Sequence, residues 1–226
     1  MDFLTVLFVI GITAEGVTGA LAAGRERMDL FGVVMIACVT GIGGGSIRDI
    51  LLGHYPLSWV EHPYYLVLIS VAAIVTVSIA SIMRHFKTLF LVLDALGLAV
   101  FAIFGARVAL EMGYGLVIAV AGAVITGVFG GVLRDLLCNR IPLVFREELY
   151  ASVAILVALL YVGLTHLGVT EVWTAVAALV FGFGLRLAAI WFRLRLPVFD
   201  YQAVQHRADD ATRRHPWSLR RRAADD

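Results

Sequence analysis

Long apolar stretches separated by short polar segments make up most of the chain. Each stretch is near the ~20 residues that an α-helix needs to cross the hydrocarbon core of a bilayer. Seven such stretches lie at about 3–23, 30–52, 64–83, 88–110, 114–137, 149–167 and 172–192. The pattern therefore predicts an all-α membrane protein with seven transmembrane helices.

The composition favours a membrane protein over a soluble one. Hydrophobic residues make up 61% of the 226 positions and charged residues only 15%, whereas an average chain has about 25% charged residues. This leaves too little polar surface to face water, so lipid must cover much of the molecule. After Leu196 the chain turns polar and Arg-rich, and we expect a mobile cytoplasmic tail at 197–226.

Basic residues fall almost entirely on one side of the predicted helices. Fourteen of the eighteen Lys and Arg residues lie in the odd-numbered connections or in the C-terminal region. The segments on the other side contain none, and the other four basic residues lie within predicted helices: Arg48, Arg107, Arg134 and Arg186. By the positive-inside rule, the N-terminus is outside and the C-terminus is cytoplasmic.

The sequence matches itself without a gap at an offset of 86 positions. The aligned pairs are Thr40-Gly41 with Thr126-Gly127, Gly44-Gly45 with Gly130-Gly131, and Arg48-Asp49 with Arg134-Asp135. Apolar sequence produces chance matches of Leu, Val and Ala, but not of Arg-Asp pairs and glycines together. We therefore infer an internal duplication.

Each copy holds three predicted helices, an odd number, so the second copy must enter the membrane from the opposite side. The expected organisation is a three-helix repeat at 1–87, an inverted three-helix repeat at 88–170 and an added seventh helix at 171–196. Inverted repeats of this kind place a shared site near the bilayer midplane, flanked by discontinuous helices.

Glycines cluster near the middle of the second and fifth predicted helices. Each glycine weakens a helix by about 1 kcal/mol relative to Ala, and we predict a kink or an unwound turn there. In lipid, freed backbone groups must face protein or a water-filled cavity, where carbonyl and hydroxyl oxygens would attract cations. The candidate pore residues are Thr40, Gly41, Gly43, Gly44, Gly45, Ser46, Thr126, Gly127, Gly130 and Gly131.

The same glycines fit a second interpretation. Gly41 to Gly45 and Gly127 to Gly131 each form GxxxG, the spacing that lets two membrane helices pack closely. The spacing favours packing and pore lining equally. The two are compatible, because closely packed helices can flank a conduit.

An Arg-Asp pair follows each glycine cluster: Arg48-Asp49 and Arg134-Asp135. Ionisable side chains at the centre of a membrane span cost at least ~2.5–3.5 kcal/mol each and usually face a cavity or a partner. We predict a charged gate or internal pairing for these four residues. Neighbours point about 100° apart on a helix, so we expect each to bond to a residue other than its neighbour. The alternative is snorkelling to the interface.

Two single carboxylates within the predicted helices break the repeat. Glu15 aligns with Phe101, and Asp94 aligns with Phe8. Glu15 lies in the second half of its helix, so we group it with the charged gate or pairing residues. Asp94 lies near the start of its helix, and we expect it to mark the cytoplasmic boundary.

Motifs of enzymes and of cofactor sites do not occur in the sequence, which has no HExxH, no Ser/His/Asp grouping and no phosphate-binding glycine loop. Cys38 and Cys138 have neither metal-ligand spacing nor a disulfide framework. We expect no enzymatic activity, no cofactor and no metal site. Membrane lipid is the expected partner, nucleic acid is not, and the Arg-rich tail would attract anionic headgroups.

The segments Gly-Gly-Gly-Ser-Ile-Arg-Asp-Ile-Leu-Leu-Gly at 43–53 and Gly-Gly-Val-Leu-Arg-Asp at 130–135 resemble the prokaryotic branch of the TRIC (trimeric intracellular cation) channel family. The resemblance covers residues 1 to about 195. It implies a homotrimer in a prokaryotic plasma membrane, with a pore for monovalent cations such as K⁺ or Na⁺ in each protomer. It also implies kinks at Gly43–Gly45 in the second helix and at Gly127, Gly130 and Gly131 in the fifth. The Lys-Glu-Val motif that animal members use for phosphoinositides does not occur here.

Two functional hypotheses follow from these patterns. The first is a passive K⁺ channel with its pore between the second and fifth helices. The alternative is a secondary transporter of a small amino acid such as glycine, because broken helices in inverted repeats also occur in carriers.

Overall fold

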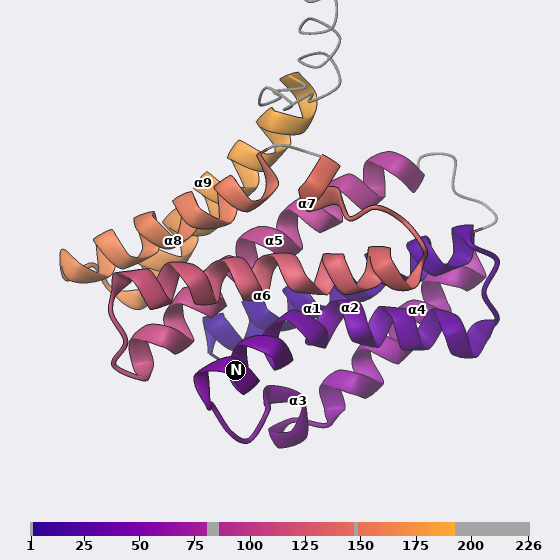
Figure 1. Ribbon diagram of the computed structural model, residues 1–226, viewed down its shortest axis with the longest axis horizontal. Coiled ribbons are helices and arrows are strands. Elements are labelled where there is room, and N and C mark those ends of the chain that lie inside the picture. Colours follow the sequence, from indigo (N-terminus) through magenta and orange to yellow (C-terminus); the bar gives the residue numbers. More distant parts are fainter. Residues whose placement is uncertain (1, 81–85, 147–148, 193–226) are drawn as a thin grey trace, which may run out of the picture. The chain divides into compact units, whose positions relative to one another are not determined.

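In lipid, a backbone must satisfy its polar groups internally, and a chain with such long apolar runs can do so by forming helices. The computed structural model describes residues 2–80, 86–146 and 149–192, which belong to one compact unit of helices (Figure 1). The helices within these ranges are α1 (Phe3–Arg25), α2 (Leu30–Leu52), α3 (Ser58–Glu61), α4 (Tyr64–Ala80), α5 (Phe86–Glu111), α6 (Leu116–Leu137), α7 (Leu143–Arg146), α8 (Tyr150–His166) and α9 (Glu171–Phe192).

Five of the described helices, α1, α2, α5, α6 and α9, are long and apolar enough to span a membrane. The chain is therefore an all-helical integral membrane protein. Helices α4 and α8 have 17 residues each, or about 26 Å at 1.5 Å per residue, slightly less than the ~30 Å hydrocarbon core. The count of seven crossings and the orientation thus stay predictions, and the predicted tail at 197–226 lies outside the described residues.

The duplication read from the sequence extends to the helix ends. Helices α2 and α6 begin at Leu30 and Leu116, 86 positions apart, and α4 and α8 begin at Tyr64 and Tyr150, again 86 positions apart. Two pairs of residues with positive φ repeat at the same offset: Arg27 with Gly113, and Gly53 with Asn139. The two halves therefore share backbone turns as well as sequence.

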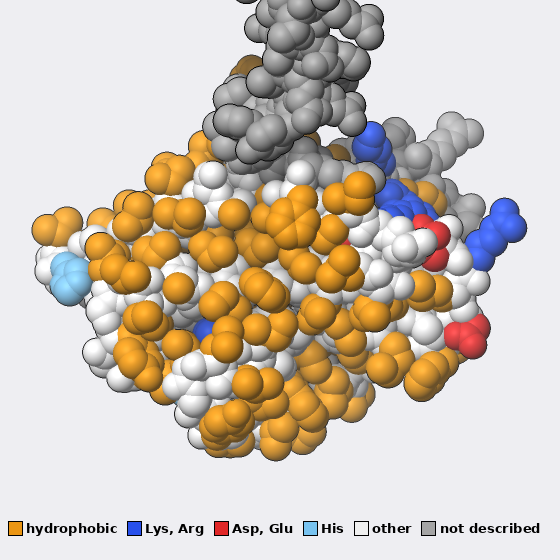
Figure 2. All heavy atoms as spheres, viewed as in Figure 1, with side chains coloured by type: hydrophobic (Ala, Val, Ile, Leu, Met, Phe, Trp, Pro, Cys, Tyr) orange, Lys and Arg blue, Asp and Glu red, His pale blue; other side chains and the backbone are white. Residues whose placement is uncertain are grey.

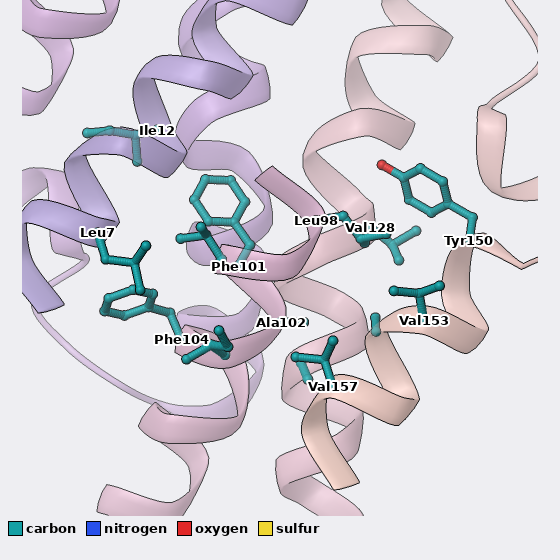
Figure 3. Packing of buried hydrophobic residues seen from close by; sticks show 14 of the residues in the cluster. Leu7, Ile12, Leu98, Phe101, Ala102, Phe104, Val128, Tyr150, Val153 and Val157 are labelled. Atoms are coloured by element: carbon teal, nitrogen blue, oxygen red, sulfur yellow. The ribbon is translucent and has the colours of Figure 1, made fainter. Parts of the chain in front are cut away.

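The core forms around α1 and α5, which are buried along most of their length. Helix α5 packs against α1, α6, α8 and α9, and α2 packs against α1 and α6. Figure 3 shows the apolar side chains that α1, α5, α6 and α8 contribute to this core. On the outside, apolar side chains cover most of the face in Figure 2, as expected for a surface against lipid.

The predicted unwound turns are wrong. Helices α2 and α6 are continuous α-helices through Gly43–Gly45 and through 127–131. Close packing offsets the poor helix propensity of glycine, because neighbouring helices bury Gly41 and Gly44 of α2 and Gly127, Gly130 and Gly131 of α6. A bend without loss of helical structure stays a prediction.

Candidate functional site

Helices α2 and α6 meet backbone to backbone at the glycine clusters. A Cβ atom added at Gly44 would collide with the carbonyl oxygen of Thr126, and one added at Gly130 would collide with that of Thr40. The two contacts are reciprocal under the 86-position offset. Gly44 and Gly130 thus have the close-packing role that the GxxxG spacing indicates.

The last glycine of each cluster makes room for an arginine. A Cβ at Gly45 would lie 3.8 Å from Arg48 Nη2, and a Cβ at Gly131 would lie 3.4 Å from Arg134 Nη2. Because residues three apart share a helix face, each guanidinium folds back over the turn that contains its glycine. The guanidinium groups of Arg48 and Arg134 can therefore lie close to the backbones of α2 and α6.

The first of these arginines forms what we call the Arg48 site. Arg48 donates to Asp49 Oδ1 from Nε at 2.9 Å and from Nη2 at 2.6 Å, and its Nη1 lies 3.5 Å from Thr126 Oγ1 on α6. His54 Nδ1 lies 3.1 Å from the same carboxylate oxygen, and the Ser58 hydroxyl lies 3.4 Å from the other. Asp49 thus joins α2 to the segment that follows it.

A cavity of about 20 Å³ adjoins the Arg48 site, which is room for one water molecule. Its wall includes the rings of Phe8 and Phe101, whose centroids are 6.2 Å apart. Six predicted site residues share this wall with those rings: Gly41, Gly45, Ser46, Arg48, Asp49 and Thr126. Helices α1, α2, α5 and α6 thus converge on one small polar space.

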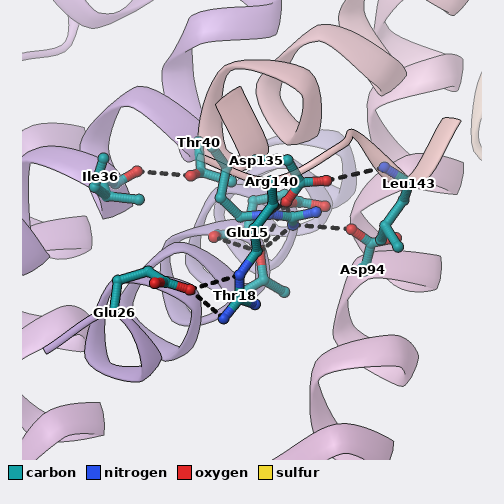
Figure 4. Close-up of polar contacts among 10 residues, drawn as sticks. Glu15, Thr18, Glu26, Ile36, Thr40, Asp94, Asp135, Arg140 and Leu143 are labelled. Carbon is teal, nitrogen blue, oxygen red and sulfur yellow. Dashed lines mark hydrogen bonds and ion pairs between the residues drawn. The ribbon is translucent and has the colours of Figure 1, made fainter. Parts of the chain in front are cut away.

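The second arginine lies in a denser set of charges, which we call the Arg134 site. Arg134 Nε donates to Asp135 Oδ1 at 2.9 Å, and Nη1 donates to Asp94 Oδ1 at 2.9 Å and to Thr18 Oγ1 at 3.0 Å. Glu15 Oε2 lies 3.7 Å from Nη1. Figure 4 shows Glu15, Thr18, Asp94 and Asp135 converging from α1, α5 and α6. The Phe90 ring lies 4.6 Å from the guanidinium carbon.

The structure bears on several sequence-based interpretations of these charges. As expected, each arginine has a polar contact on another helix, Arg134 with Asp94 and Arg48 with Thr126. Both also bond to their sequence neighbours, because the long Arg side chain spans the 100° between adjacent positions. Snorkelling does not occur, since Arg48 is 3% exposed and Arg134 is 0% exposed. Asp94 is fully buried against Arg134, so it has a charged partner inside the helix bundle.

The two sites differ at positions that the duplication makes equivalent. At the Arg134 site, Asp94 and Glu15 face the guanidinium. At the Arg48 site, the residues 86 positions away are Phe8 and Phe101, which line the cavity beside Arg48. One copy of the site therefore has two additional carboxylates where the other has two aromatic rings.

The sequence did not predict Thr18 or Tyr150 as site residues. Thr18 lies one helical turn after Glu15, and this i,i+3 spacing was its only signal. Tyr150 lines the pocket beside Arg134, and the Arg186 guanidinium stacks on its ring at 4.6 Å. The described residues contain no group of three His, Cys, Asp or Glu side chains able to hold a metal ion.

A family model described as glycine transporter matches residues 5–81 and also residues 91–166. The UPF0126 inner membrane protein YadS of Escherichia coli is 39% identical over 195 residues, which are 85% of this chain and 94% of YadS. The TRIC trimeric intracellular cation channel orthologue from Rhodobacter sphaeroides is 40% identical, with a TM-score of 0.82 over 86% of this chain and all of that one.

The chain belongs to the prokaryotic TRIC family, which includes the UPF0126 membrane proteins. A further TRIC cation channel structure, reported for its basis of conductance, is 31% identical with a TM-score of 0.81, and the match covers 89% of this chain and 99% of that one. The two family-model matches begin 86 positions apart, at the same offset as the Arg48 and Arg134 sites. Each half thus resembles the family pattern separately.

Proposed function

We propose that this TRIC family protein is a cation channel selective for monovalent cations such as K⁺. The observation that carries the proposal is its likeness in sequence and fold to the Rhodobacter sphaeroides cation channel orthologue over nearly all of the described helices. The fold supports a conduit inside one protomer, because α2 and α6 bring two polar sites to opposite ends of one helix pair.

The proposed pathway follows α2 and α6 past the predicted site residues. The cavity beside Arg48 would be one entrance, with Gly41, Gly45, Ser46 and Thr126 along its wall. The Arg134 site would face the other end, where the side chains of Glu15, Asp94 and Asp135 would lie beside the path. Because the backbones of α2 and α6 touch at Gly44 and Gly130, ions would pass beside this crossing or require the helices to separate.

The proposal extends to the assembly and its orientation. By likeness to the trimeric orthologue, we propose a homotrimer in the inner membrane, with seven crossings per protomer in two inverted three-helix repeats and a seventh helix. The positive-inside pattern supports an external N-terminus. Lipid is the expected surrounding partner, given the apolar outer face in Figure 2.

Purified protein in planar bilayers tests the channel. We expect stepwise currents in KCl that reverse near the K⁺ equilibrium potential and vanish when a bulky organic cation replaces K⁺. To locate the path, Ser46→Cys is placed in a background without Cys38 and Cys138, and a positively charged thiol reagent is added. Modification should reduce the current. Val117→Cys is the matched control, because Val117 is 79% exposed on the outer surface of α6.

The alternative is a secondary transporter of glycine, which the description of the matching family model favours. A carrier would drive saturable counterflow of labelled glycine in liposomes without unitary currents. That pair of results would replace the channel proposal. Unitary currents without glycine counterflow would exclude the carrier.

A further inference from the structure

The buried charges of the Arg134 site do not balance. Glu15, Asp94 and Asp135 contribute three formal negative charges, and each side chain is at most 6% exposed. Arg134 contributes one positive charge, and Arg186 on α9, stacked on Tyr150 of α8, contributes a second. Arg25 is exposed, and Glu26 and Arg140 bond to each other, so these three lie outside the buried set. One negative charge remains, and a buried unpaired charge costs several kcal/mol.

The packing on the α7 and α8 side of Arg134 limits which cation can balance the charge there. The pocket formed there by α6, α7 and α8 has a cavity volume of about 0 Å³, whereas even one water needs roughly 10–15 Å³. A K⁺ or Na⁺ ion would need still more room for its oxygen ligands. A proton needs none, because it binds on an oxygen that is already in place.

The contacts of Thr18 point to Glu15 as the carboxyl that holds that proton. Thr18 Oγ1 lies 2.9 Å from the Glu15 backbone carbonyl and 3.0 Å from Glu15 Oε2, and it accepts from Arg134. A hydroxyl has one proton and two lone pairs. If Thr18 donates to the backbone carbonyl, as helical Thr residues commonly do, the 3.0 Å contact requires a proton on Glu15. If Glu15 were ionised, its backbone carbonyl and its carboxylate would compete for the single hydroxyl proton of Thr18.

The other two carboxylates have better electrostatic partners. Asp94 and Asp135 each lie 2.9 Å from a guanidinium nitrogen, whereas Glu15 lies at 3.7 Å, beyond hydrogen-bond distance. The fold also leaves a dedicated slot for the Glu15 side chain. A Cβ at Gly97 of α5 would collide with Glu15 Oε1. At the equivalent position in the first half, Gly11 lies against Val100 and Phe101 instead.

We propose that Glu15 is a proton-binding site of this protein, and that its proton balances the buried charges around Arg134. Protonated Glu15 donates to Thr18, and the buried set of charges is then neutral. Release of the proton adds one negative charge beside α6. If the chain conducts cations as proposed above, this charge makes the conductance depend on pH.

Infrared spectroscopy of the purified protein tests the proton site without any reference to conduction. We expect a protonated-carboxyl C=O band at neutral pH that shifts in D₂O, disappears on alkaline titration and is missing in Glu15→Gln. Glu111→Gln is the matched control, because Glu111 is 55% exposed, and it should keep the band. Absence of the band from the wild type, or its survival in Glu15→Gln, would overturn the assignment.

Two further measurements complete the test. Thr18→Val should keep the band but move it, because the carboxyl O–H loses its acceptor. An unchanged frequency would contradict the proposed hydrogen bond, and this readout remains available if Glu15→Gln does not fold. Bilayer currents of wild type and Glu15→Gln across pH then test the effect on conduction. A titrating band with pH-independent currents would retain the proton site and reject its influence on the channel.

Discussion

At the residue scale, burial determines how much the four charged residues after the glycine clusters contribute to the stability of the protein. Arg134 holds two aspartates at 2.9 Å and is wholly enclosed. Arg48 has one aspartate, and that aspartate also contacts His54 and Ser58. Loss of one partner of a buried pair is costly because the remaining charge has no substitute for water. The two arginines should therefore differ in their effect on stability.

We expect Arg134→Met to lower the free energy of unfolding by about 3–5 kcal/mol, the range for a broken buried pair. Arg48→Met should cost less, because Asp49 keeps two polar neighbours. Arg107→Met is the comparison, and it should cost least, because Arg107 is only partly buried and its partners Glu111 and Glu171 are both exposed. Thermal unfolding in detergent gives the order, and equal losses for Arg134→Met and Arg107→Met would contradict it.

At the element scale, the crossing of α2 and α6 depends on the absence of two side chains. Gly44 and Gly130 each face a backbone carbonyl of the other helix. A backbone carbonyl cannot rotate away as a flexible side chain can, so any larger residue must push the helices apart. The same crossing aligns the Arg48 and Arg134 sites along one helix pair. Separation of the helices should thus affect both stability and the proposed pathway.

Gly44→Ala and Gly130→Ala should each destabilise the protein by roughly 1–3 kcal/mol, the usual cost of overpacking. Gly184→Ala in α9 is the matched control, because a Cβ there meets nothing within 4 Å. It should be neutral or slightly stabilising, given the better helix propensity of Ala. Melting temperatures in one detergent compare the three variants, and a Gly44→Ala protein as stable as Gly184→Ala would refute the packing role.

At the scale of the whole molecule, the two halves share sequence and helix ends but have diverged in charge. Positions equivalent to Glu15 and Asp94 are aromatic beside Arg48. A protein with inverted halves would thus have one aromatic and one acidic end to its central helix pair. The basic residues outside the predicted helices lie in the odd-numbered connections and the C-terminal region. By the positive-inside rule, they predict which end of this helix pair faces the cytoplasm.

Cysteine labelling in intact cells tests that orientation. Single cysteines replace Val60 and Lys87 in a background without Cys38 and Cys138. Val60 is 51% exposed on α3, and Lys87 is exposed at the start of α5. A membrane-impermeant maleimide should label Val60→Cys in intact spheroplasts and Lys87→Cys only after lysis. The reverse pattern would place the N-terminus inside.

The sequence alone determined the helical membrane class, the duplication and the residues of the two Arg-Asp pairs. The membrane class can be read from the sequence because a helix that crosses lipid needs a long apolar stretch. The duplication can be read because the two copies keep the same spacing of glycines and Arg-Asp pairs. Tertiary structure decided the rest. It made α2 and α6 continuous, because neighbouring helices pack against their glycines. It also brought Glu15 and Asp94, which are 79 positions apart in the chain, to the same guanidinium of Arg134. Such contacts depend on how helices pack, and no spacing within one helix encodes them.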